Sequence, residues 1–472
     1  MRVRDIGSGH HPWWAAAIVA IAVARGLIWT QLLPPWYGPD EMAHYDYVQQ
    51  LALTGTTPAA APLRPDGRDV PTEVRCAATN AGVVADGAYF AEPPFVPDPR
   101  GCRMPPPGQG RLAGAPTNPA GEYGPAYYAL AVPFWAAAVA SSPGVRLEAV
   151  RLLSVLLGGL AALFCYLAGF WAFSGDRRLA ATAATVFTFQ PMLSQQTATV
   201  TNDALLITVG AAFFWRLFRA VRRPPAVTDM ALLGLLVGLA YWVKPQGALL
   251  ALMVPFAILP GAHAAGFRTP APAAAARGLA VAAVVAVVAA VLAMGLQIHL
   301  RGSAIPVATT PGALHHSFHD YLHLLEQRGY AYPGFLFMWT SWGAFGWFAA
   351  SLPAGAYEVI AGVMALSAAG LCVRVRRHRD DRWVAATAAG SAVIVWIALL
   401  AVEATYFRAT GAVLLQGRDS FMALSPLVIA LVAGLLLPLP RIVRGPAAAW
   451  VCAAALALQV LSSFVLVEAF FA

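Results

Sequence analysis

The sequence predicts an all-α protein that crosses a membrane many times. Its 472 residues are 59% hydrophobic and 11% charged, with a mean hydropathy of +0.63. A water-soluble core stops growing well before this size, so a soluble fold would have no use for so much apolar surface. Apolar runs recur along the chain, several of them near the ~20 residues that a helix needs to cross hydrocarbon. We therefore expect a single polytopic domain over residues 1–472 with about 11 transmembrane helices.

The apolar runs give the predicted spans in order. No small-residue cleavage site follows the first run, so it is expected to stay as a helix rather than act as a signal peptide. Several runs are short, and their boundaries can shift by several residues. The predicted spans lie near residues 13–33, 150–172, 180–197, 203–219, 230–243, 247–262, 277–299, 354–373, 383–404, 420–438 and 447–470.

Arginine sets the predicted orientation. The formal net charge is +8, but the basic residues gather in four short loops rather than on a nucleic-acid-binding surface, so no nucleic-acid partner is expected. The positive-inside rule places these loops in the cytoplasm, together with the N-terminus. Arginine outnumbers lysine. Alanine is also abundant, and the two biases together suggest a GC-rich bacterial genome and an inner (plasma) membrane protein. The four loops carry Arg177 and Arg178; Arg216, Arg219, Arg222 and Arg223; Arg374, Arg376, Arg377, Arg379 and Arg382; and Arg441 and Arg444.

This orientation depends on residues 124–142, which are apolar enough to be mistaken for a span. A crossing there would invert every later loop and turn all four arginine clusters outward. We therefore predict a helix that lies on the outer leaflet. The consequence is a large first extracytoplasmic loop with short juxtamembrane helices at 34–149, and a second outer loop with an interfacial aromatic segment at 300–353.

The first outer loop opens with a predicted helix at 39–54, with Pro39 in its first position and Gly55 at its end. Asp40 and Glu41 fall in the first turn, and His44 lies one turn after Asp40 on the same face. A carboxylate beside a membrane cavity can act as a general base toward a hydroxyl. The alternative is that both acids only complement the helix dipole.

Three further polar groups fall on the same predicted side. Asn202 and Asp203 occupy a tight turn, where they either contact substrate or cap the next helix. Lys244 is the only lysine of the chain, and it either binds phosphate or anchors a span end at the interface. Gln416 and Arg418 precede the span at 420, where a cation opposes the helix dipole and calls for an anion.

Cysteines and histidines give two smaller hypotheses. Cys76 and Cys102 share the first outer loop, and an oxidising exterior permits a disulfide between them, with two free thiols as the alternative. His315, His319 and His323 repeat every fourth residue and would align on one helix face. No carboxylate joins this stripe, so it is a weak metal candidate. A divalent metal is left open, and no cofactor is otherwise expected.

Four motifs occur in the order of a known family. Residues 39–45 (PDEMAHY) after the first span, 201–204 (TNDA), 342–347 (WGAFGW) and 416–418 (QGR) resemble the conserved segments of domain-of-unknown-function family 2142, a bacterial membrane family. Ala344 stands where that family usually has arginine, and Asp419 where tyrosine is common. The resemblance runs from about residue 34 to 437.

That family is similar to the GT-C superfamily of glycosyltransferases. The resemblance implies a GT-C-like fold, Asp40 as the catalytic acid with Glu41 as the other candidate, and a polyprenyl-phosphate sugar as donor. Lys244 and Arg418 are then candidates for the donor phosphate, with His44, Asn202, Asp203 and Gln416 as other substrate-binding residues.

The expected reaction transfers a hexosyl or pentosyl group to a cell-envelope glycan or lipid on the extracytoplasmic side. The chain shows no nucleotide-binding motif, which agrees with a lipid-linked donor. The alternatives are a transporter or flippase of lipid-linked glycan precursors, and a membrane scaffold without enzymatic activity.

Overall fold

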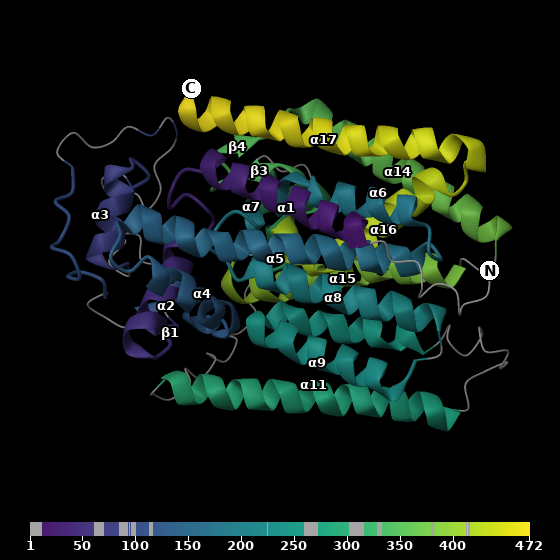
Figure 1. The fold of residues 1–472 in the computed structure, drawn as a ribbon, viewed down its shortest axis with the longest axis horizontal. Helices are drawn as coiled ribbons and strands as arrows, with labels where there is room; N and C mark the ends of the chain where they lie inside the picture. Colours follow the sequence, from purple (N-terminus) through teal and green to yellow (C-terminus); the bar gives the residue numbers. More distant parts are fainter. Residues whose placement is uncertain are drawn as a thin grey trace.

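The protein is a bundle of long helices with a group of short helices gathered at one end (Figure 1). Its structure, a computed structural model, describes most of the chain. The described residues are 12–60, 70–84, 93, 95, 101–112, 117–223, 225–258, 272–301, 316–327, 333–378, 382–411, 413 and 416–472. The start of the first helix (Pro12–Leu32) and the end of the last helix (Arg441–Phe471) lie at opposite ends of the bundle (Figure 1).

Eight helical segments among the described residues are long and apolar enough to cross a membrane. The fold class predicted from the sequence, an all-α multi-pass membrane protein, is therefore confirmed. These segments are α1 (Pro12–Leu32), α5 (Pro143–Ala172), α8 (Asp203–Arg222), α11 (Pro272–Arg301), α14 (Ala354–Arg377), α15 (Arg382–Thr410), η5 (Gly417–Ala423) continued by α16 (Leu424–Leu436), and α17 (Arg441–Phe471).

The other three predicted spans correspond to shorter elements. The run at 180–197 is broken into α6 (Arg177–Thr188) and α7 (Pro191–Gln196). Pro191 lacks a backbone N–H, and the side chain of Gln190 accepts the N–H of Leu193, so a new helix starts there. The runs at 230–243 and 247–262 become α9 (Val227–Val243) and the 3-10 helix η3 (Pro245–Ala257), separated by Lys244.

Helix α5 runs across the middle of the view in Figure 1 and packs on α1, α6 and α8. Small residues allow close approach between helices, as they commonly do in membranes. A Cβ at Gly158 would meet the side chain of Thr197 after α7, and one at Gly210 of α8 would collide with the carbonyl of Met422 in η5. The close approach at Gly210 brings η5, which carries Arg418, against α8.

The short elements of the predicted first outer loop gather where α1 ends and α5 begins (Figure 1). They are α2 (Glu41–Thr54), β1 (Ala59–Ala60), α3 (Thr72–Asn80), β2 (Thr117–Asn118), η2 (Pro119–Glu122) and α4 (Ala126–Ala137). β1 and β2 pair in parallel, and Gly55 in the left-handed region ends α2 as predicted. The Cys76–Cys102 disulfide is present, so this pair is bridged rather than free.

The second predicted outer loop also contains regular structure. It holds α12 (Phe318–Gln327), α13 (Pro333–Trp342) and an antiparallel pair of two-residue strands, β3 (Ala344–Phe345) and β4 (Ala350–Ser351). Ala344 and Phe345 are fully buried, and the Phe345 ring lies edge-on to Trp29 of α1, 5.6 Å between centroids. The hairpin thus packs against the end of α1.

Candidate functional site

Asp40 lies in the turn between α1 and α2, outside the helix. The sequence predicted that Pro39 would be the first helical residue and that Asp40 would lie in the first turn, and this is wrong. α2 begins at Glu41, and Asp40 adopts the left-handed region at φ 57° and ψ 13°. Aspartate tolerates this region better than most side chains. Its side chain makes no capping bond and stays 41% exposed, so the carboxylate faces outward rather than onto the helix end.

A charged cluster surrounds this turn and joins four segments that are far apart in sequence. We call it the outer charge cluster, after the side of the membrane that the sequence predicts for it, and it comprises Asp40, Asp203, Lys244, Arg418 and Asp419. Lys244 Nζ lies 2.9 Å from Asp203 Oδ1 and 3.0 Å from Asp419 Oδ1. Arg418 reaches the Asp40 carboxylate at 3.3 Å. The predicted residues of three separate motifs therefore meet at one place.

The outer charge cluster has three carboxylates and two cations. Burial lowers the pKa of Lys244, but the carboxylates of Asp203 and Asp419 outweigh it and hold that pKa above its ordinary value. Lys244 therefore stays charged and neutralises two acids. Arg418 is the less satisfied cation, because its buried Nε has no hydrogen-bond partner among the described residues and lies 3.9 Å from Asp203 Oδ2.

His44 lies under the cluster and is buried. Its Nδ1 shares a 2.8 Å hydrogen bond with the Tyr128 hydroxyl, and its ring stacks near Tyr123. Burial lowers the pKa of His44 to about 4, against the opposing carboxylates of Asp40 and Asp203. The imidazole is therefore neutral at pH 7, where it can donate or accept a hydrogen bond but adds no charge to the site.

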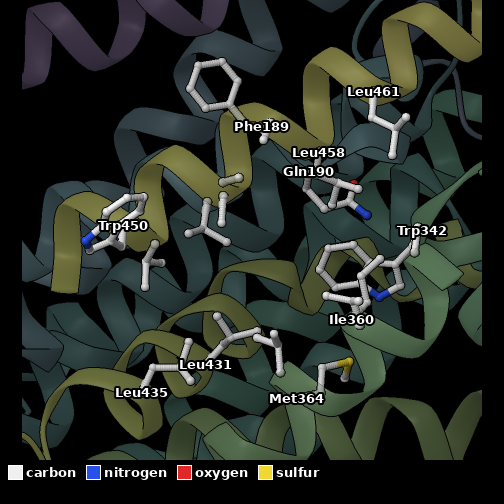
Figure 2. A pocket seen from close by; sticks show the side chains of 18 of the residues that line it. Phe189, Gln190, Trp342, Ile360, Met364, Leu431, Leu435, Trp450, Leu458 and Leu461 are labelled. Atoms are coloured by element: carbon white, nitrogen blue, oxygen red, sulfur yellow. The ribbon is translucent and has the colours of Figure 1, made fainter.

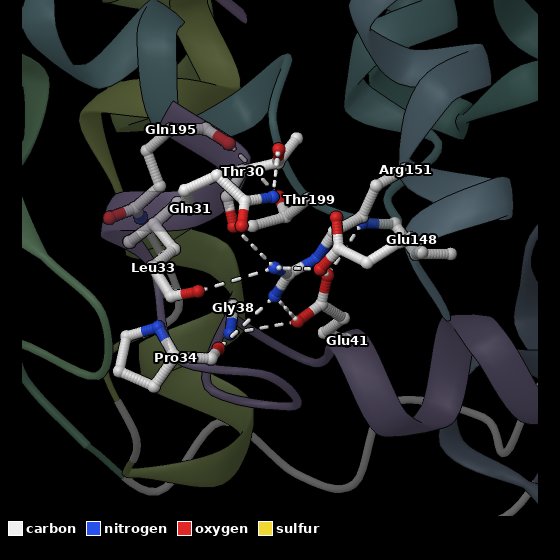
Figure 3. Close-up of polar contacts among 11 residues, drawn as sticks. Thr30, Gln31, Leu33, Pro34, Gly38, Glu41, Glu148, Arg151, Gln195 and Thr199 are labelled. Carbon is white, nitrogen blue, oxygen red and sulfur yellow. Dashed lines mark hydrogen bonds and ion pairs between the residues drawn. The ribbon is translucent and has the colours of Figure 1, made fainter. Parts of the chain in front are cut away.

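Glu41 faces the opposite way from Asp40. It is fully buried, and each carboxylate oxygen accepts two hydrogen bonds. Arg151 of α5 donates from Nε at 2.8 Å and from a terminal nitrogen at 2.7 Å, and the backbone N–H groups of Gly38 and Val200 supply the other two (Figure 3). A carboxylate with its acceptor sites filled in this way is poorly placed to take a proton from a substrate.

The remaining predicted residues, Asn202 and Gln416, make hydrogen bonds that involve backbone groups next to the cluster. Asn202 makes no side-chain cap to α8, and instead its amide donates to the carbonyl of Val243 at 3.1 Å, just before Lys244. The backbone N–H of Gln416 donates to Asp419 at 3.1 Å. Both residues therefore help to position the cluster residue that follows or neighbours them.

Sequence reasoning missed Arg151, although a signal was present. Arg146 and Arg151 lie on α5 at the end of the bundle that carries the first outer loop, whereas the other arginine clusters were assigned to the opposite end. Both are at most 1% exposed. The other arginines gather on the predicted cytoplasmic side, so an arginine at the opposite end indicates a specific bonding partner. That argument could be made from the sequence.

The predicted histidine stripe is only partly described. His315 lies outside the described residues, and His323 is exposed on α12, where it lies beside Gln327 and Glu326. Within the part of the chain that the structure describes, no group of three potential ligands is arranged to hold a metal ion. The prediction of a metal site at this stripe therefore gains no support from the described residues.

Comparison of the sequence with known proteins gives a match between part of this chain and one family. The sequence profile of the family described as dolichyl-phosphate-mannose-protein mannosyltransferase matches residues 129–291, about a third of the 472-residue chain. No curated protein matches the sequence.

Among solved structures, the fold is similar to ArnT from Cupriavidus metallidurans bound to undecaprenyl phosphate, with a TM-score of 0.51 and 14% identity over 97% of this chain and 77% of that one. The oligosaccharyltransferase of Archaeoglobus fulgidus gives a TM-score of 0.47 and 12% identity over 95% of this chain and 53% of that one. The present chain therefore spans about half the length of the oligosaccharyltransferase.

The chain therefore has a fold similar to that of ArnT, in agreement with the predicted GT-C-like fold. The narrower resemblance to domain-of-unknown-function family 2142 stays a prediction.

Proposed function

We propose that the protein is a membrane glycosyltransferase that moves a sugar from a polyprenyl-phosphate donor to a hydroxyl of a cell-envelope acceptor. The observation that carries the proposal is the outer charge cluster, in which a partly exposed aspartate and an incompletely satisfied arginine lie 3.3 Å apart. One group can take a proton while its neighbour stabilises a leaving phosphate. The family match and the fold similarity support the same class of reaction.

In the proposed reaction, Asp40 removes the proton of the acceptor hydroxyl, and the resulting oxygen attacks the anomeric carbon. The bond from that carbon to the phosphate oxygen breaks, and the lipid phosphate leaves with the electron pair. The new glycosidic bond has inverted configuration, because the attack comes from the face opposite the leaving group. Arg418 stabilises the negative charge that develops on the phosphate, the kind of electrostatic contribution that is usually the largest in catalysis.

Lys244 has a different proposed role from the one its sequence context suggested. Both of its strong contacts are to carboxylates, so a phosphate would have to displace one of them. We assign it to holding Asp203 and Asp419 in place beside Arg418. Asp40 is favoured over Glu41 as the base, because the oxygens of Glu41 are already occupied.

A lipid-linked donor also needs room for its chain. An apolar cavity of about 640 Å³ lies between α14, α16 and α17, with Gln190 and Trp342 among the side chains that line it (Figure 2). A second cavity of about 170 Å³ shares Trp342 and Met364 with the first and extends to Ser341. Ser341 lies against Gly417, the residue before Arg418. The second cavity therefore lies near the backbone that precedes the proposed phosphate-binding residue.

We place this site on the extracytoplasmic face of a bacterial inner membrane. Arg222 donates to the carbonyls of Trp171 and Ala172 at the far end of α5, away from the first outer loop. The arginine-rich segment at the end of α8 therefore lies at the other end of α5 from the cluster, as the positive-inside rule requires for a cytoplasmic face.

The test is sugar transfer by the purified protein in liposomes, with a panel of radiolabelled polyprenyl-phosphate sugars and cell-envelope extract as acceptor. We expect transfer by the wild type, none by a folded Asp40→Asn variant, and normal transfer by Asp320→Asn, an exposed acid on α12. Equal transfer by the wild type and Asp40→Asn would remove Asp40 from the mechanism. Lipid movement across the bilayer without any transfer would support the flippase alternative instead.

A further inference from the structure

We propose that Arg151 and Glu41 form a positioning pair that fixes the turn carrying Asp40. This inference rests on the proposed function, because it assigns the pair a role in orienting the proposed base. Neither side chain faces the outer charge cluster, and neither is expected to touch the substrate. Their effect would be exerted through the backbone of residues 33–41.

Arg151 bonds to both sides of that segment. Its terminal nitrogens donate to the carbonyls of Thr30, Leu33 and Pro34, at 3.0, 3.2 and 3.1 Å (Figure 3). It also holds Glu41 with two parallel bonds. The last turn of α1 and the first residue of α2 are therefore tied to one guanidinium on α5.

Glu41 also holds the turn, through its two carboxylate oxygens. One of its oxygens accepts the backbone N–H of Gly38 at 3.2 Å, within the turn itself, and the other accepts the N–H of Val200 at 2.9 Å. Gly38 packs closely on Thr199, since a Cβ added there would lie 2.6 Å from the Thr199 methyl carbon. The turn is thus held from α1, from α5 and from the loop between α7 and α8.

This fixation has a physical reason in the backbone of residue 40. A non-glycine residue in the left-handed region is strained, and such strain persists only where surrounding contacts determine the conformation. Asp40 makes no capping bond of its own that would hold it there. Glu41 is the next residue in sequence, and its ion pair with Arg151 is fully buried. The contacts around Glu41 therefore determine where the Asp40 carboxylate points.

Arginine is required at position 151 because of its shape. The guanidinium has five N–H donors in a planar fork. Here it contacts six acceptors, which are three carbonyls, both oxygens of Glu41 and one oxygen of Glu148. One terminal nitrogen shares its two N–H groups among Thr30, Leu33 and Glu148. A lysine would keep the charge but has three donors at one atom and no fork. Arg151→Lys is therefore expected to preserve charge balance while loosening the turn.

Arg146 supplies a matched control on the same helix. It is also buried, but it bonds to the Tyr45 hydroxyl, to Glu73 and to the carbonyls of Val139 and Ser141. None of these groups belongs to residues 33–41. Arg146→Lys is the same chemical change in a site that supports α3 and the end of α4.

The experiment compares the two variants with the wild type in nanodiscs by hydrogen exchange and by steady-state kinetics. For Arg151→Lys we expect faster exchange in residues 34–44, unchanged exchange in 70–84, and a kcat that falls about 10–100-fold with little change in KM, as a misplaced catalytic group produces. For Arg146→Lys we expect the reverse exchange pattern and a kcat close to that of the wild type.

The two readouts separate this inference from the proposed function. Exchange in 34–44 that Arg151→Lys leaves unchanged would overturn the positioning role, whatever the protein catalyses. Faster exchange in that segment with an unchanged kcat would also overturn it, because the turn would then move without consequence for the reaction. Faster exchange in a protein that transfers no sugar at all would instead contradict the proposed function while leaving the structural role of Arg151 in place.

Discussion

At the scale of single residues, the two adjacent acids of the site have opposite environments. Asp40 is partly exposed beside one arginine, whereas Glu41 is fully buried and bonded to another. The left-handed conformation at Asp40 turns these neighbours to different sides. The sequence predicted the pair as candidates but could not separate them, because their difference arises from a backbone conformation and from Arg151, which is 110 positions away.

A second acid within α2 gives a prediction about pH. Asp46 is buried, and burial raises its pKa to about 7, although the hydrogen bond from the Asn118 amide at 2.7 Å opposes the rise. Its pKa in the unfolded chain is about 3.9. The folded protein therefore holds a proton that the unfolded chain releases between these values, and stability present at low pH is lost as the pH rises through about 7. The full effect is on the order of 4 kcal/mol.

We expect Asp46→Asn, which cannot ionise and can still accept from Asn118, to remove this loss. Its thermal stability relative to the wild type should increase as the pH is raised from 5 to 8. The measurement is thermal unfolding of both proteins in detergent across that range. A stability difference that stays constant with pH would show that Asp46 does not titrate there.

At the scale of elements, the site depends on breaks between helices. Asp40 lies between α1 and α2, Lys244 between α9 and η3, and Arg418 in the 3-10 helix η5. Asp203 is the first residue of α8. Helix ends leave backbone groups unsatisfied, so polar residues gather where the elements break. This is why motif positions could be predicted from sequence while their mutual contacts could not.

The Cys76–Cys102 disulfide gives a prediction about the predicted first outer loop. Cys76 lies on α3, and the side chain of Asn80 bonds to both backbone groups of Cys102. The disulfide and the Asn80 amide therefore both connect α3 to Cys102. Closing a loop with a sequence separation of 26 is worth about 3.5 kcal/mol in the chain-entropy account.

Cys76→Ser should therefore speed trypsin cleavage after the exposed Arg103 in the reconstituted full-length protein. Cys372→Ser, which removes an exposed free cysteine on α14, should leave the cleavage rate unchanged. Equal cleavage of the wild type and Cys76→Ser would mean that the bridge does not order this part of the loop.

At the scale of the whole molecule, hydropathy and arginine placement predicted the helical membrane fold. Three predicted spans proved short or broken because a proline interrupts them, as at Pro191 and Pro245. The outer charge cluster forms only when α8, η5 and the α1–α2 turn come together, and Gly210 permits the closest of these approaches. Such packing between distant segments leaves no local pattern in a single sequence.

The most direct test of the central claim is the single-turnover rate of sugar transfer with the protein preloaded with its polyprenyl-phosphate donor. Donor binding is measured in parallel for the wild type and Asp40→Asn. We predict that Asp40→Asn binds the donor like the wild type but transfers the sugar about 10²–10⁴-fold more slowly, the range typical for loss of a general base. Equal single-turnover rates, with the donor bound equally by both proteins, would contradict the claim that Asp40 activates the acceptor.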